Sequence, residues 1–255
     1  LTIYMNDGID PIDGKRKSGP VSLKKLEEYQ TFEEFYDGYK ALLDYYLDLS
    51  VKAQYHSYEV MNQHVSFLFT SLLTDDCIAR GKALLDGGVR YLGGTNETYG
   101  NINTSDSLWV IRDLVFNQKK YTLRQLNDAM LANFNGYEAL RKDCLNCDKY
   151  GNDLETADTM ANDLYEFVAK GVRNRGIAIG MQYFLIVISN NQLNTEWGNR
   201  TAASPDGRLS CMYMNPANNP QGGANKSGPT AMLNSLAKFD AKYHGGSVQN
   251  IKFSP

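Results

Sequence analysis

Four cysteines and three histidines are the side chains of this sequence with the widest chemical reach. Cys144 and Cys147 form a C-x-x-C pair, a spacing that occurs in zinc sites and in redox dithiols. A zinc ribbon requires a second such pair, which this sequence lacks. A thioredoxin-like pair lies where a strand enters a helix, whereas this pair follows a predicted helix. We therefore interpret both residues as structural or solvent-facing thiols and expect no metal site.

The histidines form no catalytic or metal-binding pattern. His56 and His64 lie eight residues apart in a predicted helix, whereas two helical metal ligands lie four residues apart. His244 is isolated near the C-terminus. Spacing alone leaves a Ser-His-Asp triad open, but the sequence has no G-x-S-x-G elbow, no phosphate loop and no Rossmann glycine pattern. Surface or packing roles are the simpler interpretation, and we assign no catalytic residue.

Residues 93–107, GGTNETYGNINTSDS, are denser in polar groups than a connecting loop requires. The candidate ligand contacts in this segment are Asn96, Glu97, Asn101 and Asn103. One interpretation is a capped loop that leads from a strand into a helix beginning near residue 105. The other is a polar lining at the end of a strand, where α/β folds bind ligands. The sequence favours neither.

Residues 200–210, RTAASPDGRLS, have the composition of an exposed loop with a tight turn at Pro205, Asp206 and Gly207. Arg200 and Arg208 flank this PDG turn. A long segment with little to bury, NPANNPQGGANKSGPTA, comes soon after it.

Helices must position these segments. A capping box at TFEE, residues 31–34, opens a long amphipathic helix that we expect to break before Leu72, and Thr74 should cap a helix that ends at Gly87. The remaining expected elements are an extended stretch at 89–92, helices at 105–117, 123–134 and 154–173, a buried strand at 178–189, a loop at 190–229, a helix at 230–239 and a strand at 247–253. Strands separated by helices indicate an α/β fold with a parallel or barrel-like sheet.

Composition excludes several function classes. The net charge of −3 and the scattered basic residues argue against nucleic acid or an anionic membrane as a partner. The apolar runs are too short to span a bilayer, no signal peptide is visible, and four cysteines are too few for a disulfide scaffold. We expect a soluble, cytoplasmic protein with reduced thiols. The chain starts at Leu1 and ends in QNIKFSP, and we expect both ends to be points of truncation.

Seven segments occur in an order and spacing that resemble one family. They are LLTDDCIARGKALLDGGVRY, ETYGNINTSDSLWVIRDLVF, YTLRQLNDAMLANFNGYEALR, KYGND, SPDGR, GPTAMLNSLAKFD and VQNIKF. Together they resemble the glycyl radical enzymes of the pyruvate formate-lyase-like group, in particular its dehydratase and lyase branch. The resemblance implies that residues 1–255 are the C-terminal half of a ten-stranded α/β barrel surrounded by helices.

The resemblance also implies a chemistry. In this family a separate adenosylmethionine-dependent iron–sulfur activase removes a hydrogen from a backbone glycine, and the glycyl radical then generates a cysteine thiyl that attacks the substrate. Radical cleavage of a C–O, C–N or C–C bond in a small metabolite, in anaerobic metabolism, is the implied function. The implied partners are the rest of the barrel, the activase, the small-molecule substrate and, at full length, a second copy in a homodimer.

The sequence departs from the family pattern at both radical positions. It contains neither the G-C-x-x motif of the catalytic cysteine nor the R-V-x-G-[YF] motif of the radical glycine. We expect this chain to be a fragment that lacks the glycyl radical domain. Such a fragment would bind no cofactor and would be inactive alone. The alternative is a non-enzymatic binding or assembly partner of an intact relative. An anaerobic ribonucleotide reductase is disfavoured, because the quoted segments resemble the lyase branch more closely.

The resemblance finally gives the long polar segment a role. Arg200, Asp206, Gly207 and Arg208 would hold an irregular loop against the barrel, with the two arginines paired to carboxylates or carbonyls. Substrate contacts from the same loop would come from Asn218, Asn219 and Gln221.

Overall fold

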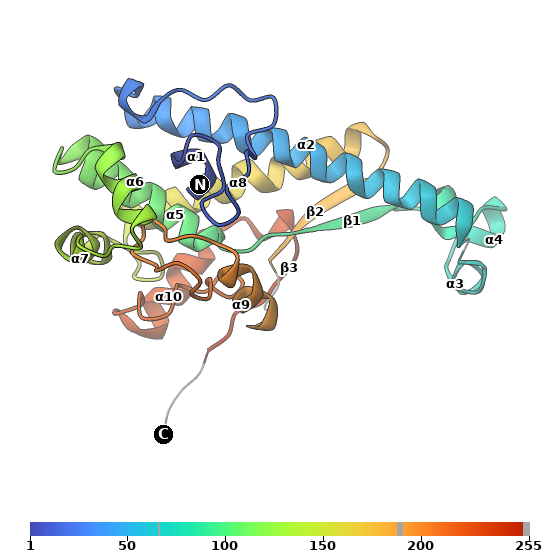
Figure 1. Cartoon of the computed structure of the whole chain (residues 1–255). Coiled ribbons are helices and arrows are strands. Elements are labelled where there is room, and N and C mark those ends of the chain that lie inside the picture. Colours follow the sequence, from blue (N-terminus) through green and yellow to red (C-terminus); the bar gives the residue numbers. More distant parts are fainter. Residues whose placement is uncertain (66, 188–190, 252–255) are drawn as a thin grey trace.

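Helices make up most of the computed structural model, which describes residues 1–65, 67–187 and 191–251 (Figure 1). The helices are α1 (Thr2–Met5), α2 (Phe32–His64), α3 (Leu68–Leu73), α4 (Cys77–Arg80), α5 (Asn101–Val110), α6 (Leu123–Leu131), α7 (Glu138–Asn146), α8 (Glu155–Ala178), α9 (Asn191–Asn199) and α10 (Gly228–Ala237). The strands are β1 (Gly93–Glu97), β2 (Gln182–Val187) and β3 (His244–Ser247). Short 3₁₀ turns occur at Leu26–Glu28 and Ala241–Tyr243, an irregular turn with Gly87 in the left-handed region at Leu84–Gly88, and a π-helical turn at Ile111–Asn117.

The long helix α2 begins where the sequence predicts it. Thr31 Oγ1 accepts a hydrogen bond from the Glu34 amide at 3.2 Å, which satisfies one of the free donors of the first turn. The other half of the predicted capping box differs, because the Glu34 carboxylate accepts from the amide of Gln30 (3.1 Å) instead of Thr31. The helix ends at His64, which confirms the predicted break before Leu72.

Beyond residue 51, α2 projects away from the body and carries α3 and α4 at its far end (Figure 1). We call the described residues between 52 and 91 the arm. The predicted helix from Thr74 to Gly87 is wrong, because Thr74 closes α3 and donates its hydroxyl to the Thr70 carbonyl at 2.8 Å. Gly81, with φ of 62°, then ends α4 after a single turn.

The three strands form a parallel sheet in the order β1–β2–β3. Gly93 pairs with Gln182 and Glu97 with Ile186, and a bulge after Leu185 interrupts the pairing of β2 with β3. The predicted strand at 178–189 is confirmed for Gln182–Val187, whereas Ala178 ends α8 and residues 188 and 189 lie outside the described residues. The strand β1 lies in GGTNE, a segment read as loop, because pairing with β2 outweighs its poor strand propensity. The strand β3 comes earlier than the predicted 247–253, of which 252 and 253 lie outside the described residues.

One face of the sheet is covered by the layer that α2 and α8 form (Figure 1). On β1, Asn96 points to this layer and its Oδ1 accepts from Ser50 Oγ on α2 at 3.0 Å. Successive side chains of a strand point to opposite faces. Thr95 and Glu97 therefore point to the other face, and both are exposed.

The main core lies between the first half of α2 and the helices α5 to α7. It contains Phe35, Leu108, Ile111 and Leu126, each 1% exposed or less. A smaller cluster of Ile102, Tyr150, Tyr165 and Phe239 joins α5, α8 and the end of α10. These clusters fix α5 on two sides, and α5 carries most of the candidate site.

The helix α9 lies inside the segment that we predicted as a loop. Its sequence, NQLNTEWGN, has little apolar periodicity. Its tertiary contacts include the stacking of Trp197 on Tyr99, with ring centroids 6.4 Å apart, and a hydrogen bond from the Met214 amide to the Asn194 carbonyl at 3.3 Å. Tertiary contacts of this kind are not visible in a local pattern.

Candidate functional site

The PDG turn is buried against α5, not exposed as its composition suggests, because residues 202–208 are all buried. Asp206 Oδ1 accepts from Ser204 Oγ at 2.5 Å and from the Arg208 amide at 3.3 Å. Its amide donates to Ser107 Oγ on α5 at 3.1 Å. Gly207 has φ of 94°, and a Cβ there would lie 2.6 Å from Leu145. The turn therefore requires glycine at this position.

The two flanking arginines have different environments. Arg208 is 5% exposed and donates to the carbonyls of Ala202, Leu209 (3.2 Å) and Met212 (2.9 Å). Burial lowers the pKa of its guanidinium, and the Asp206 carboxylate opposes this shift. Arg200 lies on the surface, where it pairs with Glu196 at 2.7 Å. The buried Arg208 side chain thus stabilises the irregular loop by donating to three of its carbonyl groups.

A network of side-chain amides joins the start of α5 to the loop after the PDG turn. Asn103 Nδ2 donates to Asp206 Oδ2 at 2.7 Å and to Gln221 Oε1 at 3.0 Å. Asn101 Nδ2 donates to Asn218 Oδ1 at 2.8 Å. The structure therefore brings together four of the seven predicted ligand contacts: Asn101, Asn103, Asn218 and Gln221. They are joined through Asn215, a residue that the sequence analysis did not single out.

The other three predicted contacts lie elsewhere. Asn219 is 7% exposed and exchanges two hydrogen bonds with the Asn250 backbone, at 2.6 and 3.2 Å. Asn96 lies on β1 facing α2. Glu97 ends β1, is exposed, and accepts from Tyr99 Oη at 2.8 Å. The helix predicted to begin near residue 105 begins earlier, because α5 starts at Asn101 after Gly100 in the left-handed region.

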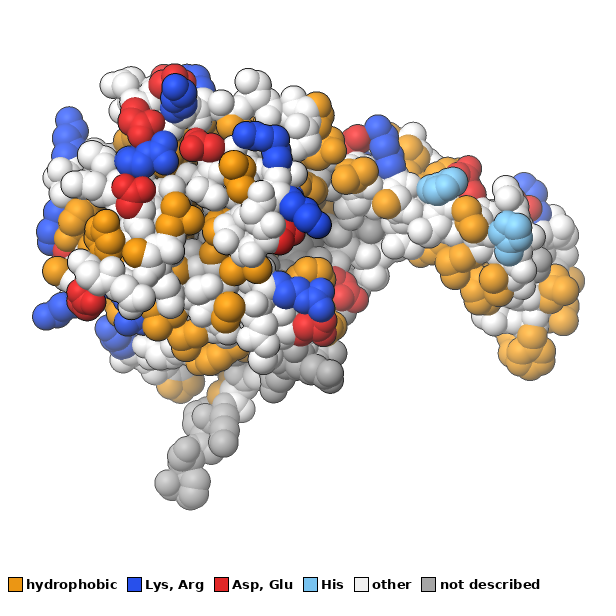
Figure 2. All heavy atoms as spheres, in the orientation of Figure 1, with side chains coloured by type: hydrophobic (Ala, Val, Ile, Leu, Met, Phe, Trp, Pro, Cys, Tyr) orange, Lys and Arg blue, Asp and Glu red, His pale blue; other side chains and the backbone are white. Residues whose placement is uncertain are grey.

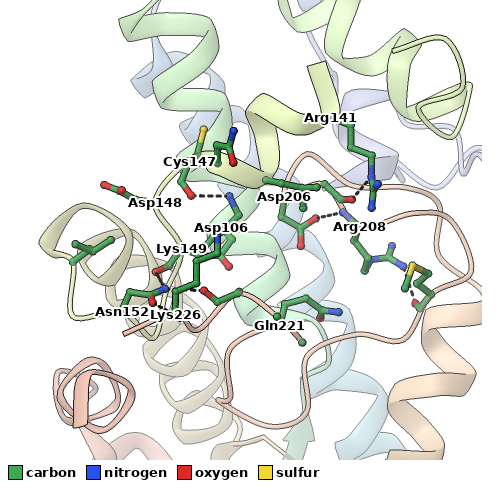
Figure 3. A pocket seen from close by; sticks show the side chains of 18 of the residues that line it. Asp106, Arg141, Cys147, Asp148, Lys149, Asn152, Asp206, Arg208, Gln221 and Lys226 are labelled. Carbon is green, nitrogen blue, oxygen red and sulfur yellow. Dashed lines mark hydrogen bonds between the residues drawn. The ribbon is translucent and has the colours of Figure 1, made fainter. Parts of the chain in front are cut away.

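A cavity of about 490 Å³ opens beside the PDG turn (Figure 3). It is bounded by α5, the end of α7, the turn itself and the 221–227 loop. Asn152 ties two of these walls together. Its Nδ2 donates to the Ala224 carbonyl at 2.9 Å, and its Oδ1 accepts from the amides of Lys226 (2.7 Å) and Ser227 (3.1 Å).

Asp106 lines this cavity from the middle of α5. The residue is 1% exposed, and its Oδ1 accepts from the Tyr150 amide at 2.9 Å. Desolvation raises the pKa of the carboxyl to about 8, and the positive charge of Lys149 opposes the rise. Sequence reasoning missed both residues. The KYGND segment that contains Lys149 was noticed only as part of the resemblance.

Lys149 itself is 7% exposed and sits at the carboxyl end of α7. Its ammonium donates to the carbonyls of Cys144 (2.6 Å) and Cys147 (3.2 Å), a favourable place for a cation at a helix C-terminus. Burial raises the pKa of the Cys144 thiol to about 12 and that of Cys147 to about 11. Both thiols are therefore protonated at neutral pH.

Within the described ranges, no three Asp, Glu, Cys or His side chains lie close enough together to hold a metal ion. His56 is exposed beside Glu59, with Nδ1 3.3 Å from the carboxylate. His244 stacks on Tyr165 with centroids 4.7 Å apart, and its Nε2 lies 3.3 Å from Asn218 Nδ2. None of the described helices is long and apolar enough to cross a membrane.

The arrangement defines a segment of an α/β fold in which a parallel sheet and a docked polar loop meet at one helix. The pyruvate formate lyase-like family model matches residues 1–193, and the chain belongs to this family. It is 31% identical to the trans-4-hydroxy-L-proline dehydratase of Clostridioides difficile over 100% of this chain and 32% of that protein. It is 30% identical to the probable dehydratase YbiW of Escherichia coli over 98% of this chain and 32% of that protein.

Solved structures agree with this assignment. The hydroxyproline dehydratase of Clostridioides difficile, with its substrate bound, superposes with a TM-score of 0.89 at 30% identity, covering 96% of this chain and 31% of the other. A structure for 1,2-propanediol dehydration in Roseburia inulinivorans gives 0.87 at 29% identity over 95% and 31%. The chain thus spans about a third of the length of the relatives that it matches.

Proposed function

We propose that this chain is part of the barrel of a glycyl radical dehydratase or lyase that cleaves a C–O, C–N or C–C bond of a small metabolite. The observation that carries the proposal is the match of the whole chain to a dehydratase of this family. Other relatives are named isethionate sulfite-lyase and 4-hydroxyphenylacetate decarboxylase glycyl radical subunit. The reaction class therefore follows from the relatives, and the substrate is left to experiment.

The exposed face of the sheet supports the proposal that the sheet is part of a barrel. Parallel sheets are normally covered on both faces, because crossover helices or a closed barrel bury them. Here the layer of α2 and α8 covers one face, while Thr95 and Glu97 on β1 are exposed on the other. Further strands of a longer polypeptide would close the sheet and enclose this face. Residues 1–255 would then be the C-terminal portion of the barrel domain.

In such an enzyme the residues of this chain bind, orient and exclude water. Hydrogen abstraction is the contribution of the glycyl radical and its partner cysteine, whose motifs this sequence does not contain. Asn103, Asn218 and Asn219 are buried and hydrogen-bonded, which suits the positioning of a loop. Glu97 and Gln221 are better placed for substrate, because Glu97 is exposed and Gln221 is half-buried at a cavity. A carboxylate or amide there accepts a hydrogen bond from a substrate hydroxyl.

The same family assignment implies the activating enzyme, the oligomeric state and the cellular location that we expect. Activation would come from an adenosylmethionine iron–sulfur activase, the full-length enzyme would form a homodimer, and the location would be the cytoplasm. This chain would bind no cofactor of its own.

The test uses the native polypeptide that contains this sequence. Its intact mass is measured first, and the protein is then incubated without oxygen with a glycyl radical activase and adenosylmethionine. We expect a mass several-fold above 28.6 kDa, a glycyl radical signal in electron paramagnetic resonance, and turnover of a hydroxylated small molecule. A large polypeptide that acquires no radical would contradict the proposal.

A native mass of 28.6 kDa would favour the alternative, a non-enzymatic binding or assembly partner of an intact relative. One observation fits that alternative: the arm exposes several large apolar side chains to solvent.

A further inference from the structure

We propose that the cavity beside the PDG turn binds a small hydroxylated organic anion, a carboxylate or a phosphate ester. In this site, Asp106 contacts a hydroxyl group of the ligand, and the cationic side chains of the cavity wall contact its anionic group (Figure 3). Gln221, proposed above as a substrate contact, also lines this cavity, so the proposal rests in that respect on the function proposed above; the binding tests below do not require the radical reaction.

The first observation is an unsatisfied acid. Asp106 is 1% exposed, and its Oδ2 has no hydrogen-bond partner among the described residues, although Oδ1 is bonded to the Tyr150 amide. A buried polar atom without a partner is unfavourable, because it has lost its hydrogen bonds to water. Asp106 lines the cavity, and a ligand group that reaches Oδ2 from inside the cavity would satisfy it. A ligand hydroxyl suits this position, since it donates to a carboxylate and accepts from a carboxylic acid.

The second observation is a surplus of donors. Lys149 uses two of its three ammonium hydrogens on the carbonyls of Cys144 and Cys147. Arg141 bonds the Gly207 carbonyl at 2.9 Å through Nε, which leaves the terminal nitrogens of its guanidinium for other acceptors. Lys226 is exposed at the opposite wall, and its backbone amide, not its ammonium, bonds Asn152.

The acids of the wall do not balance these donors. Asp206 is already bonded to Ser204, Arg208 and Asn103. Asp148 accepts from Thr156 Oγ1 at 2.7 Å and keeps its charge, but the wall carries four cationic side chains, those of Arg141, Lys149, Arg208 and Lys226, against three acids. The groups that remain are mainly donors with positive charge, and they suit a ligand rich in acceptors with negative charge.

The cavity is built by the fold and is not a gap between mobile side chains. Its walls come from four separate parts of the chain, and Asn152, Arg141 and Asp206 join them by the hydrogen bonds already given. Its volume of about 490 Å³ lies within the range of small-molecule sites.

The first experiment measures binding to the purified native polypeptide that contains this sequence by isothermal titration calorimetry. The probes are glycerate, glycerol 3-phosphate and propionate, which carries a carboxylate but no hydroxyl. We expect glycerate or glycerol 3-phosphate to bind, and propionate to bind about tenfold more weakly than glycerate, because only a hydroxyl satisfies Asp106. Whichever of glycerate and glycerol 3-phosphate binds more tightly identifies the anionic group of the ligand as a carboxylate or a phosphate ester. The proposal would be overturned if neither glycerate nor glycerol 3-phosphate binds. It would also be overturned if propionate binds as tightly as a glycerate that does bind.

The second experiment locates the probe. Lys226→Met should weaken binding about tenfold through loss of a charge-assisted bond, and Lys226→Arg should restore it. Lys142→Met is the matched control, because Lys142 is exposed on α7 and does not line the cavity. The bound probe should also protect Lys226, but not Lys142, from acetylation, as read by peptide mass spectrometry. Binding that neither Lys226 variant changes, with no protection of Lys226, would place the ligand elsewhere and refute the site.

Discussion

Asn103 and Asn215 each use the side chain to bond the other's backbone. The Asn215 amide donates to Asn103 Oδ1 at 2.8 Å, and the Asn103 amide donates to Asn215 Oδ1 at 3.2 Å. Both residues are at most 5% exposed. This reciprocal pair docks the loop after the PDG turn on α5, although 111 residues separate the two in sequence. It explains how a segment with almost no apolar residues is held in place.

Replacing Asn103 by Ala should therefore destabilise the protein strongly. The change leaves the Asn215 amide and Asp206 Oδ2 without their bonds from this side chain. We expect the free energy of unfolding to fall by about 3 kcal/mol, since each buried group left unpaired costs on the order of 1–3 kcal/mol. Chemical denaturation measures the loss. The control is Asn174→Ala at an exposed position of α8, which should change stability by less than about 0.5 kcal/mol. Equal losses in the two variants would contradict the docking role.

This pair also shows what the sequence could not reveal. The polar segments 93–107 and 215–231 were recognisable as unusual, because both have many hydrogen-bonding groups and few large apolar ones. Their mutual pairing was not recognisable, because an Asn carries no signal for its partner at long range. The same holds for Asp106 and Lys149, whose burial depends on the packing of α5 against the end of α7.

Sequence patterns predicted the structure correctly where it depends on contacts between residues close in sequence. The Thr122–Gln125 capping box that opens α6 is present with both hydrogen bonds, at 2.9 and 3.1 Å. The strand β1 was missed because GGTNE has no strand propensity and is extended only through its pairing with β2. The helix α9 was missed for a similar reason, since its contacts with Tyr99 and Met214 are tertiary.

The buried carboxyl of Asp106 should make stability depend on pH. Its folded pKa is raised to about 8 from the usual 3.8, so the folded state holds its proton more tightly than the unfolded state. Stability then falls as pH rises between about 4 and 8, with a slope of at most about 1.4 kcal/mol per pH unit. Asp106→Asn keeps an acceptor for the Tyr150 amide and cannot ionise. We expect the stability of this variant relative to wild type to increase across that range, as measured by denaturation at several pH values.

The control for this pH effect is Asp75→Asn, because Asp75 is exposed. Its stability relative to wild type should not follow the Asp106 curve. A flat difference between Asp106→Asn and wild type from pH 4 to 8 would mean that the carboxyl is ionised in the folded protein.

The cysteines should differ sharply in reactivity. Thiols with pKa values near 12 and 11, as in Cys144 and Cys147, hold less than about one part in a thousand as thiolate at pH 8, and the thiolate is the nucleophile. Cys211 is exposed and should be alkylated by iodoacetamide first. Peptide mass spectrometry over time gives the order, and the denatured protein, in which all four cysteines react, is the control. Alkylation of Cys147 as fast as Cys211 at pH 8 would show that its thiol is not desolvated.

The arm should make this chain associate when it is produced alone. Leu68, Phe69 and Leu73 are 69–75% exposed, and Figure 2 shows hydrophobic side chains gathered along the arm. Clustered apolar surface of this kind is normally buried against a partner. We expect the isolated 255 residues to be poorly soluble or to elute as oligomers in size-exclusion chromatography with light scattering. The double variant Phe69→Glu, Leu73→Glu should shift the chain toward monomer, since charge on the arm opposes apolar association.

Leu131→Glu is the matched control for the arm, because Leu131 is 50% exposed on α6 in the body. If association runs through the arm, this change should leave the oligomer intact while the arm variant dissociates it. If both variants dissociate the chain equally, the cause is net charge and not the arm. A monomeric wild-type chain with one cooperative melt would contradict both the association and the view that residues 1–255 need the rest of a barrel to cover their apolar surface. The oligomeric state of these three proteins therefore tests the fragment hypothesis independently of any activity.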